Sequence, residues 1–561
     1  MKDMDPAVKN ASAHVEEAGA DWPSSTVVLN RSDFVQAQQD SLGEGSPPWQ
    51  VIKDNWRTCA TIVVVQLNGI ILGLEYALLG GLVGVQAFCR TMGSYNEATG
   101  MYAVADNTMS LWGGLFGLMQ FLGQLFAGWF ADRFGRTWCV YLMCLNVYLG
   151  VMTEVLSNNK YDYLGAKIIM GSATGIMQVV VPTYVAEITP REIRGISIGM
   201  FAFNLSLGSL IGTVVTYGAN QAYGSNVMDD RGWKVPLYVG LAAPTIALVG
   251  MLLLMPESPY WYILKNRVAD ARRSLQRLHP NKSAEEVDRL CHELQYTVLK
   301  ESDEQAANRD ASYWECLRGP NLQRTFSALF PSLAQQLVGN QLIQSYSTYF
   351  FGIAGLSNSL FGSVIVSVVG LVSAVVAFFL IEMKSVGRWS LVFWGVTGIT
   401  LSMLAIGIID SAAGATTSAS AGGAYVAFVA LFNAAVTIGP GVAGWAYCGE
   451  TASARLRAKT ATLAVGSNAI IGTVTNIVIP FELTAIGPKT GYMFFGIGVV
   501  CCVLIYLWIP DITGRSFSQL DELFERRIPA RQFKNAVCTG DYGHEHGRHG
   551  KGNELDKHEE V

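Results

Sequence analysis

Two stretches, VAEITPREIRG (Val185–Gly195) and YCGETASARLRAK (Tyr447–Lys459), each end a long apolar run with a cluster of charge. In each stretch a Glu is followed seven positions later by an Arg. The pairs are Glu187 with Arg194, and Glu450 with Arg457. A charged corner that occurs twice in one chain raises the possibility of an internal duplication.

Other features recur in the same order at a similar interval. The two Glu residues are 450 − 187 = 263 positions apart. The pair Gly135-Arg136 recurs as Gly387-Arg388 after 252 positions, and Pro256-Glu257 recurs as Pro510-Asp511 after 254. Several features at nearly one period predict two related halves. Parallel repeats of this kind are typical of alternating-access carriers, whose cargo site lies between the halves near the middle of the membrane.

The composition is that of a polytopic membrane protein. Of the 561 residues, 50% are hydrophobic and only 15% are charged, whereas a soluble domain has about 25% charged residues. The charge is confined to the tails and a few short islands, which leaves apolar runs of about 20 residues, long enough to cross a bilayer as helices. We predict an all-α membrane protein with twelve transmembrane helices, near residues 59–79, 108–131, 137–156, 163–186, 196–218, 235–255, 325–351, 359–382, 389–409, 424–448, 459–481 and 490–509.

The distribution of Lys and Arg predicts the orientation and the domains. Basic residues gather in the even-numbered connections, so these loops and both termini are expected in the cytoplasm. No cleavable signal peptide is expected before the first span. The expected organisation is a disordered cytoplasmic N-terminal tail, an N-terminal six-helix half, a cytoplasmic helical linker, a C-terminal six-helix half and a cytoplasmic C-terminal tail, over residues 1–55, 56–255, 256–323, 324–510 and 511–561. In the linker, Ser283 and Glu286 have the spacing of a capping box.

Catalytic and metal chemistry are not indicated. The ten Cys lie mostly within spans without metal-type pairing, and we interpret them as buried free thiols. The tail histidines, His544, His546, His549 and His558, are expected in a flexible polar tail rather than at a metal. The spans show no nucleophile–base set and no phosphate loop. We therefore expect no enzyme activity, no metal and no cofactor.

A set of motifs resembles the major facilitator superfamily, and within it the sugar porter family. The set comprises LGLEYALLGG, GWFADRFGRTW, AKIIMGSATGIMQVVVPTYVAEITPREIRG, PESPYW, AQQLVGNQLIQSYSTYFF, GPGVAGWAYCGETASARLRAK and PDITGRSFSQLDELF. The resemblance covers residues 55–527 and is closest in style to the fungal α-glucoside, maltose-type, permeases. It implies the major facilitator fold, with two six-helix halves, and import of a sugar such as an α-glucoside, another oligosaccharide or a hexose.

The resemblance implies a substrate site of inward-facing polar groups. These are Gln335, Gln336, Gln341, Trp445 and Asn468. A neutral amide offers both a donor and an acceptor to a hydroxyl-rich ligand, with no charge to desolvate. Trp445 matches the family's Trp whose flat face stacks on a pyranose ring. Amides can also join helices in lipid, so helix packing is the alternative role.

The resemblance also places Glu75 at the position of the acid that couples transport to protons. Glu75 lies among apolar neighbours in the first span, and a charge at the bilayer centre costs about 2.5 to 3.5 kcal/mol on insertion scales. An acid there pairs, faces water or titrates. The sequence leaves open whether Glu75 titrates or is permanently paired with Lys167, which replaces the Arg usual in hexose carriers.

The repeated corners are interpreted as a cytoplasmic gate. We assign Asp132, Arg136, Glu187 and Arg194 to the first set and Arg388, Glu450 and Arg457 to the second. Exposed ion pairs stabilise by only about 0 to 1 kcal/mol each, which suits a contact that must open and close. Simple anchoring of loops at the membrane surface is the alternative.

Departures from the family pattern leave the cargo open. Besides Lys167, they include Ala202 and Gln341 in the expected pocket, Val442 and Gly444 for prolines, Lys384 for an acid unless Glu382 serves, and Tyr260 for an Arg. One alternative is the same carrier fold with a non-sugar cargo, such as a polyol, a quinate-like acid or a secondary metabolite. A non-transporting sugar sensor is disfavoured by the short tail after Phe524. We expect a monomer in the plasma membrane.

Overall fold

The computed structural model describes residues 48–97, 100–190, 193–307, 312–356, 358–382, 386–413, 419–453, 455–513, 515, 517–534, 536 and 538. Most of the two expected tails, the four tail histidines and Lys384 lie outside these residues. Within the expected N-terminal tail the described element is α3 (Pro48–Asp54), which belongs to a separate unit from the rest of the chain.

Helices form nearly all of the described structure. The first half contains α4 (Trp56–Gln66), α5 (Gly69–Gly81), α7 (Asp106–Phe134), α8 (Arg136–Leu156), α9 (Lys160–Ile188), α10 (Arg194–Tyr223), α11 (Arg231–Gly240) and α12 (Ala242–Leu254). The second half contains α16 (Pro320–Leu337), α17 (Asn340–Ile353), α18 (Ser359–Glu382), α19 (Arg388–Ala413), α20 (Ala419–Ile438), α21 (Ala443–Glu450), α22 (Arg457–Ile486) and α23 (Thr490–Trp508).

Short elements connect these helices. The first two spans are joined by η2 (Leu82–Gly84), α6 (Gln86–Met92) and an antiparallel hairpin of β1 (Ser94–Asn96) and β2 (Met101–Ala103). The linker holds α13 (Pro259–Leu264), α14 (Val268–Leu278), α15 (Ala284–Ala307) and η4 (Tyr313–Leu317). Further short elements are η5 (Gly487–Lys489), α24 (Phe517–Glu525) and η6 (Ala530–Gln532).

The twelve predicted spans are confirmed. In the described residues, ten helical runs are long and apolar enough to cross a membrane, and one of them, Lys459–Trp508, contains both α22 and α23. The remaining span consists of α16 and α17, which are separated at Val338 and Gly339. The protein is thus an all-α, multi-pass membrane protein.

Four spans are broken rather than continuous, which the sequence did not predict. The breaks separate α4 from α5, α11 from α12, α16 from α17, and α20 from α21. At the third break Gly339 has a φ of 93°, a left-handed conformation that Gly adopts without steric cost. Broken helices at membrane depth occur where the freed backbone lines a cavity or is buried in protein.

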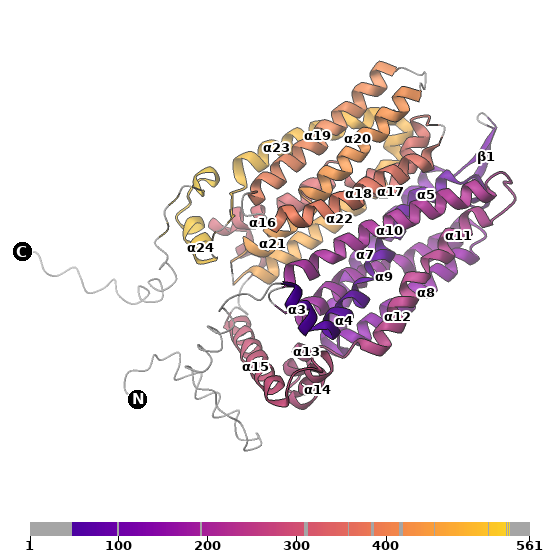
Figure 1. Ribbon diagram of the computed structural model, residues 1–561. Helices are drawn as coiled ribbons and strands as arrows, with labels where there is room; N and C mark the ends of the chain where they lie inside the picture. Colours follow the sequence, from indigo (N-terminus) through magenta and orange to yellow (C-terminus); the bar gives the residue numbers. More distant parts are fainter. Residues whose placement is uncertain are drawn as a thin grey trace, which may run out of the picture. The chain divides into compact units, whose positions relative to one another are not determined.

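The helix pairs between the halves follow the predicted duplication. Span 2 (α7) packs on span 11 (α22), and span 5 (α10) packs on span 8 (α18). An exchange of the halves turns span 2 into span 8 and span 11 into span 5, so each of these pairs is the image of the other. The pairing of α5 with α17, spans 1 and 7, maps onto itself. The long helices of both halves lie side by side in Figure 1.

The linker helices lie at the end of the bundle that carries the charged corners, called here the corner end (Figure 1). Trp261 Nε1 in α13 donates to the Asp132 carbonyl at 3.1 Å. The capping box that begins α15 is confirmed, since Ser283 N–H donates to Glu286 Oε2 at 2.8 Å and Glu286 N–H donates to Ser283 Oγ at 3.2 Å. The opposite end of the bundle is called the far end.

Close contact between α5 and α10 depends on glycine. A Cβ added at Gly208 would collide with the backbone carbonyl of Ile70, whereas a Cβ at Gly218 of the same helix would meet no atom within 4 Å. In lipid, small residues permit the close backbone approach that holds helices together. A comparison of substitutions at Gly208 and Gly218 therefore distinguishes the effect of close packing from the effect of helix propensity.

We predict that Gly208→Ala lowers the thermal stability of the purified protein, because α10 must move away from α5. The matched Gly218→Ala should be neutral or stabilise by up to about 1 kcal/mol, because Ala favours helix over Gly. Thermal unfolding of both variants in detergent measures the difference. Equal melting temperatures would contradict the proposed packing role of Gly208.

Candidate functional site

The first charged corner is built around Arg136, the first residue of α8. Its Nε donates to Glu187 Oε1 at 3.0 Å, and its Nη1 lies 3.2 Å from Asp132 Oδ1. The side chains of Arg136 and Glu187 are only 6% and 10% exposed. This pair is therefore more strongly held than an exposed ion pair, because loss of one partner would leave a buried charge uncompensated.

Glu257, which was not assigned to the gate from sequence, completes this corner. Its Oε1 accepts from the backbone N–H of Arg136 at 2.8 Å, and its Oε2 accepts from that of Thr137 at 3.1 Å. A carboxylate at a helix N-terminus is favoured by the unpaired N–H groups and the helix dipole. A Cβ at Gly135, where φ is 106°, would collide with this carboxylate. The recurring Pro-acid pair in the sequence was the signal for this role.

The second corner repeats the plan with one change. Arg388, the first residue of α19, forms an ion pair with Glu450. Its backbone N–H donates to Thr513 Oγ1 at 2.8 Å, and the Thr513 hydroxyl donates to Asp511 Oδ1 at 2.7 Å. A threonine hydroxyl thus connects the shorter Asp511 side chain to the helix N-terminus.

Two buried tyrosines show the same correspondence. Tyr184 Oη donates to the Pro256 carbonyl at 2.8 Å, and Tyr447 Oη donates to the Pro510 carbonyl at 2.9 Å. Both carbonyls follow the sixth span of their half. The two corners therefore share backbone, acid and tyrosine contacts, as the duplicated sequence implied.

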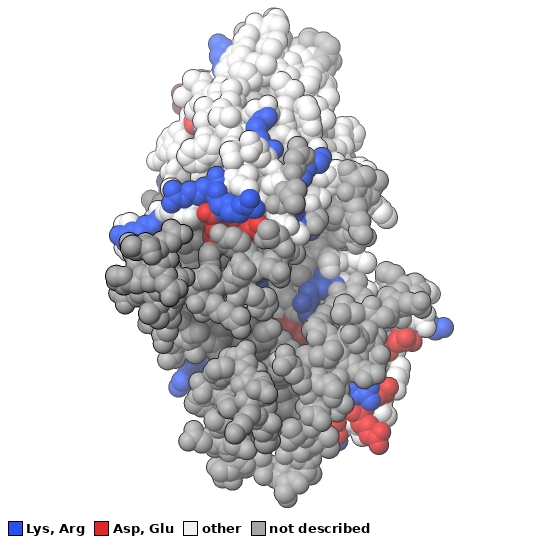
Figure 2. All heavy atoms as spheres, turned by 90° about the vertical axis from the view of Figure 1, so that its left-hand side faces the viewer, with Lys and Arg blue, Asp and Glu red and all other residues white. Residues whose placement is uncertain are grey.

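The gate residues assigned from the sequence are only partly brought together. Each described ion pair of the assigned gate residues lies within one half, Arg136 with Asp132 and Glu187, and Arg388 with Glu450. Arg194 and Arg457 are exposed as the first residues of α10 and α22. Among the described residues Arg194 has no ion-pair partner. Figure 2 shows Lys and Arg side chains beside Asp and Glu side chains on the corner end.

The assigned amides converge around the break between α16 and α17. Gln335, Gln336 and Gln341 are all buried. Gln336 Nε2 donates to Asn468 Oδ1 of α22 at 3.1 Å, and Asn468 Nδ2 donates to the Ser332 carbonyl at 3.1 Å. Among the described residues Gln336 Oε1 has no hydrogen-bond partner. An amide acceptor thus remains available to a hydroxyl donor.

Small residues bring further groups to this cluster. A Cβ at Gly472 of α22 would lie 3.4 Å from Gln341 Nε2 and 3.9 Å from Gln336 Nε2. A Cβ at Gly444 of α21 would lie 3.1 Å from Ser332 N, so α21 approaches α16 closely. The next residue, Trp445, is 39% exposed. The assigned amides thus lie beside the break in span 7, and the assigned Trp445 lies just after the break in span 10.

A second polar network lies in the first half and was missed from the sequence. Tyr76 Oη accepts from Gln120 Nε2 at 3.0 Å and from Gln178 Nε2 at 3.3 Å, while Gln124 Nε2 donates to Gln178 Oε1 at 2.6 Å. These residues come from α5, α7 and α9. Helix α7 also packs on α22, the helix of Asn468. The signal was the recurrence of Gln at positions 120, 124 and 178 inside otherwise apolar spans.

The assigned coupling residues are in direct contact. Lys167 Nζ lies 2.9 Å from Glu75 Oε2 and 2.7 Å from Glu154 Oε1. All three side chains are at most 1% exposed. The pairing of Glu75 with Lys167, which the sequence left open, is present, and Glu154 at the far end of α8 is an additional partner. The signal for Glu154 was an acid near the end of an apolar run, which resembles a span boundary.

Asn204 lies near Ala202, the span 5 position that departs from the family pattern. Asn204, two positions after Ala202, donates through Nδ2 to the Gln66 carbonyl at 3.0 Å, and Gln66 Nε2 donates to the Ser197 carbonyl at 2.8 Å. The first bond satisfies a backbone carbonyl at the break between α4 and α5, and the second joins α4 to α10. Asn204 therefore joins helices.

Hydrogen bonds between the halves lie at the far end and the middle of the bundle. Asp106 Oδ1, at the start of α7, accepts from Tyr349 Oη at 3.0 Å and from Thr484 Oγ1 at 2.8 Å. Ser110 Oγ donates to the Ile477 carbonyl at 2.7 Å. These contacts join α7 to α17 and α22, so the far end is closed in this conformation.

Comparisons with known proteins agree on the family. A family model described as sugar (and other) transporter matches residues 61–524. A hexose transporter of Saccharomyces cerevisiae is 25% identical over 534 residues, covering 92% of this chain and 94% of the relative. The general alpha-glucoside permease of the same organism is 28% identical over 502 residues, covering 85% of this chain and 76% of the permease.

Among solved structures, the inward open conformation of the xylose transporter XylE from E. coli is similar in fold. The TM-score is 0.66 at 18% sequence identity, and the match covers 83% of this chain and 99% of XylE. The matching family model and the relatives are described as transporters, so the chain is a transporter rather than an enzyme. By the extent of the family match, the chain belongs to the sugar (and other) transporter family.

Proposed function

We propose that this chain is an alternating-access carrier that imports a sugar, an α-glucoside, another oligosaccharide or a hexose, together with a proton. The observation that carries the proposal is the buried amide cluster of Gln336, Gln341 and Asn468 at the break of span 7. Its donors and acceptors carry no net charge. Such a site matches a ligand rich in hydroxyl groups, because each amide can donate to and accept from a hydroxyl. No charged side chain has to be desolvated when the ligand binds.

Relatives support the substrate class. The similar yeast proteins are described as a hexose transporter and a general alpha-glucoside permease. The partly exposed ring of Trp445, close to α16, provides an apolar surface for a pyranose face. Small-molecule sites of this kind combine a few placed polar groups with aromatic walls.

The buried Lys167 cluster supports proton coupling. Glu75 lies on α5, which packs on α17 of the other half and so sits at the interface that must change during transport. An ionisable group at such a position is a natural carrier for a proton. One proton that moves down about 100 mV supplies about 2.3 kcal/mol, enough for a concentration ratio of about fifty-fold.

The orientation follows from the positive-inside rule. Basic residues are concentrated at the corner end, so we place this end, the linker and both termini in the cytoplasm of a plasma-membrane monomer. The halves then run over 56–255 and 324–510, with the linker at 256–323. The closed far end corresponds to an inward-facing state. In this proposal the two corner sets, each held together within its own half, approach one another as the cytoplasmic gate when the corner end closes.

The test of this function is uptake of labelled maltose and labelled glucose into cells that lack their own sugar carriers. We predict uptake of at least one of the two sugars, and we predict that a protonophore abolishes its accumulation. No uptake of either sugar by protein confirmed at the cell surface would contradict the sugar assignment. That result would favour a non-sugar cargo.

We predict that Trp445→Ala weakens affinity for the transported sugar about 5- to 30-fold, because loss of a stacked ring costs about 1 to 2 kcal/mol. The matched control is Trp394→Ala in α19, whose ring is 65% exposed on the outside of the bundle. Concentration-dependent uptake measures both variants. Equal affinities in the two variants would argue against stacking on Trp445.

We predict that Glu75→Gln abolishes accumulation of sugar against a gradient but preserves exchange of labelled for unlabelled sugar. The amide keeps the shape of the side chain but cannot take up and release a proton as a carboxylate does. Counterflow and net uptake in the same cells separate the two activities. Glu75→Gln protein that still concentrates sugar would refute the coupling role.

A further inference from the structure

Glu154 gives Lys167 a second carboxylate partner. The Lys167 ammonium lies between Glu75 of α5, at 2.9 Å, and Glu154 of α8, at 2.7 Å. Lys167 itself comes from α9, so three helices of the first half meet at one charged group. Among the described residues, the ion pairs of these three side chains are confined to one another.

The surroundings of the cluster are dry. Phe88, Trp112, Tyr163 and Trp233 are at most 1% exposed and form edge-to-face contacts, with ring centroids 5.2 Å apart for Phe88 and Tyr163 and 4.7 Å for Trp112 and Tyr163. The Tyr163 ring also lies 5.0 Å from Lys167 Nζ. The aromatic group therefore covers the cluster.

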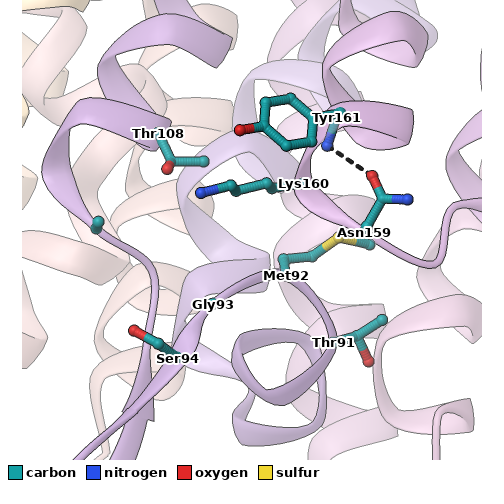
Figure 3. Close-up of a pocket in the computed structure, with 9 residues that line it drawn as sticks. Thr91, Met92, Gly93, Ser94, Thr108, Asn159, Lys160 and Tyr161 are labelled. Atoms are coloured by element: carbon teal, nitrogen blue, oxygen red, sulfur yellow. Dashed lines mark hydrogen bonds between the residues drawn. The ribbon is translucent and has the colours of Figure 1, made fainter.

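A pocket of about 270 Å³ lies outside this aromatic cover at the far end. Its lining includes Met92, Thr108 and Lys160, and the Lys160 side chain points toward Thr108 (Figure 3). Each of these residues is one helical turn from an aromatic residue of the cover, Phe88, Trp112 or Tyr163. Lys167 is seven residues from Lys160 on α9, about 10 Å deeper at 1.5 Å per residue. The cluster thus lies near the far end but is sealed from it.

The net charge of the cluster indicates its favoured protonation state. Two carboxylates and one ammonium carry a net charge of −1 when all are ionised, and such an uncompensated charge is unfavourable in a dry interior. One bound proton makes the cluster neutral. In the part of the chain that the structure describes, the other titratable side chain beside this cluster is Tyr163, whose ring lies 5.0 Å from Lys167 Nζ and whose phenol is neutral in the ordinary pH range.

For a pair of only Glu75 and Lys167, binding of a proton would be unfavourable rather than favourable. That pair is neutral without a proton, and protonation of Glu75 would leave a buried ammonium unbalanced. With Glu154 present, Lys167 keeps a carboxylate partner when Glu75 is protonated. The second carboxylate is therefore what makes proton uptake favourable.

We propose that Glu154 is a further proton-coupling residue, and that Glu75 and Glu154 share one proton across Lys167. The proton belongs to the pair of carboxylates rather than to either residue alone. This inference rests on the proposed function, in which Glu75 couples transport to protons. In this inference Glu154, which lies in span 3, is as necessary for proton binding as Glu75.

Infrared titration of the purified protein, without any sugar, tests the proposal. The carbonyl stretch of a protonated carboxyl group is followed as pH is raised. We expect wild type to show a band that is lost in one step, and Glu154→Gln to shift the midpoint of this step to lower pH by about 1 to 3 units, because a like charge has been removed. Asp162→Asn, at an exposed acid near the start of α9, should leave the midpoint unchanged.

A second variant covers the case in which Glu154→Gln does not fold. Lys167→Met leaves two buried carboxyl groups with no cation, so both should be protonated near neutral pH and the band area should double. An unchanged midpoint in Glu154→Gln, or an unchanged band area in Lys167→Met, would overturn the shared proton.

These outcomes are distinct from failure of the proposed function. Sugar uptake that is insensitive to a protonophore would refute proton-coupled transport whatever the infrared titration shows. Protonophore-sensitive uptake together with an unshifted Glu154→Gln midpoint would refute the role of Glu154 alone.

Discussion

The Lys167 ammonium is a full charge in a part of the bundle that water does not reach, and the first half is organised around its neutralisation. Glu75 and Glu154 approach it from two other helices, and Phe88, Trp112, Tyr163 and Trp233 exclude solvent. In such an interior the desolvation cost of each ion is several kcal/mol, so the charges must balance. Binding or release of one proton changes the net charge of this cluster by one unit. Proton binding therefore links the electrostatics of the first half to the energetics of transport.

The two charged corners stabilise the individual halves, whereas other contacts join the halves to each other. Each corner holds three elements of its own half together through an Arg, acidic side chains and a tyrosine that donates to a proline carbonyl. Because the described ion pairs of the corner residues stay within a half, they hold the elements of each half together at the corner end. Among the described residues, hydrogen bonds that cross between the halves lie at the far end and the middle, at Asp106, at Ser110, and between the hydroxyls of Ser209 in α10 and Ser367 in α18. Rigid halves joined at one end are what a rocking motion about a central site requires.

Much of this arrangement could be predicted from the sequence, because the duplicated corners and the apolar runs are periodic features. The twelve spans, the capping box of α15 and the family follow from such local patterns. The breaks in four spans were not predicted, because each lies inside a run of span length, and polar residues beside a break, such as Gln66 and Gln336, can equally be interpreted as site or packing residues. Glu154 was missed because it stands near a polar connection, and its role depends on a partner on another helix. The glutamine network around Tyr76 was missed for the same reason.

Coupling through the Lys167 cluster makes the proton a stoichiometric partner of the sugar, and the number of protons moved per sugar tests this most directly. Purified protein in sealed liposomes, with a pH indicator inside and labelled maltose or glucose outside, reports both fluxes at once. Because the Lys167 cluster becomes neutral with one proton, we predict that one proton moves inward with each sugar molecule. Sugar entry without proton movement would contradict it.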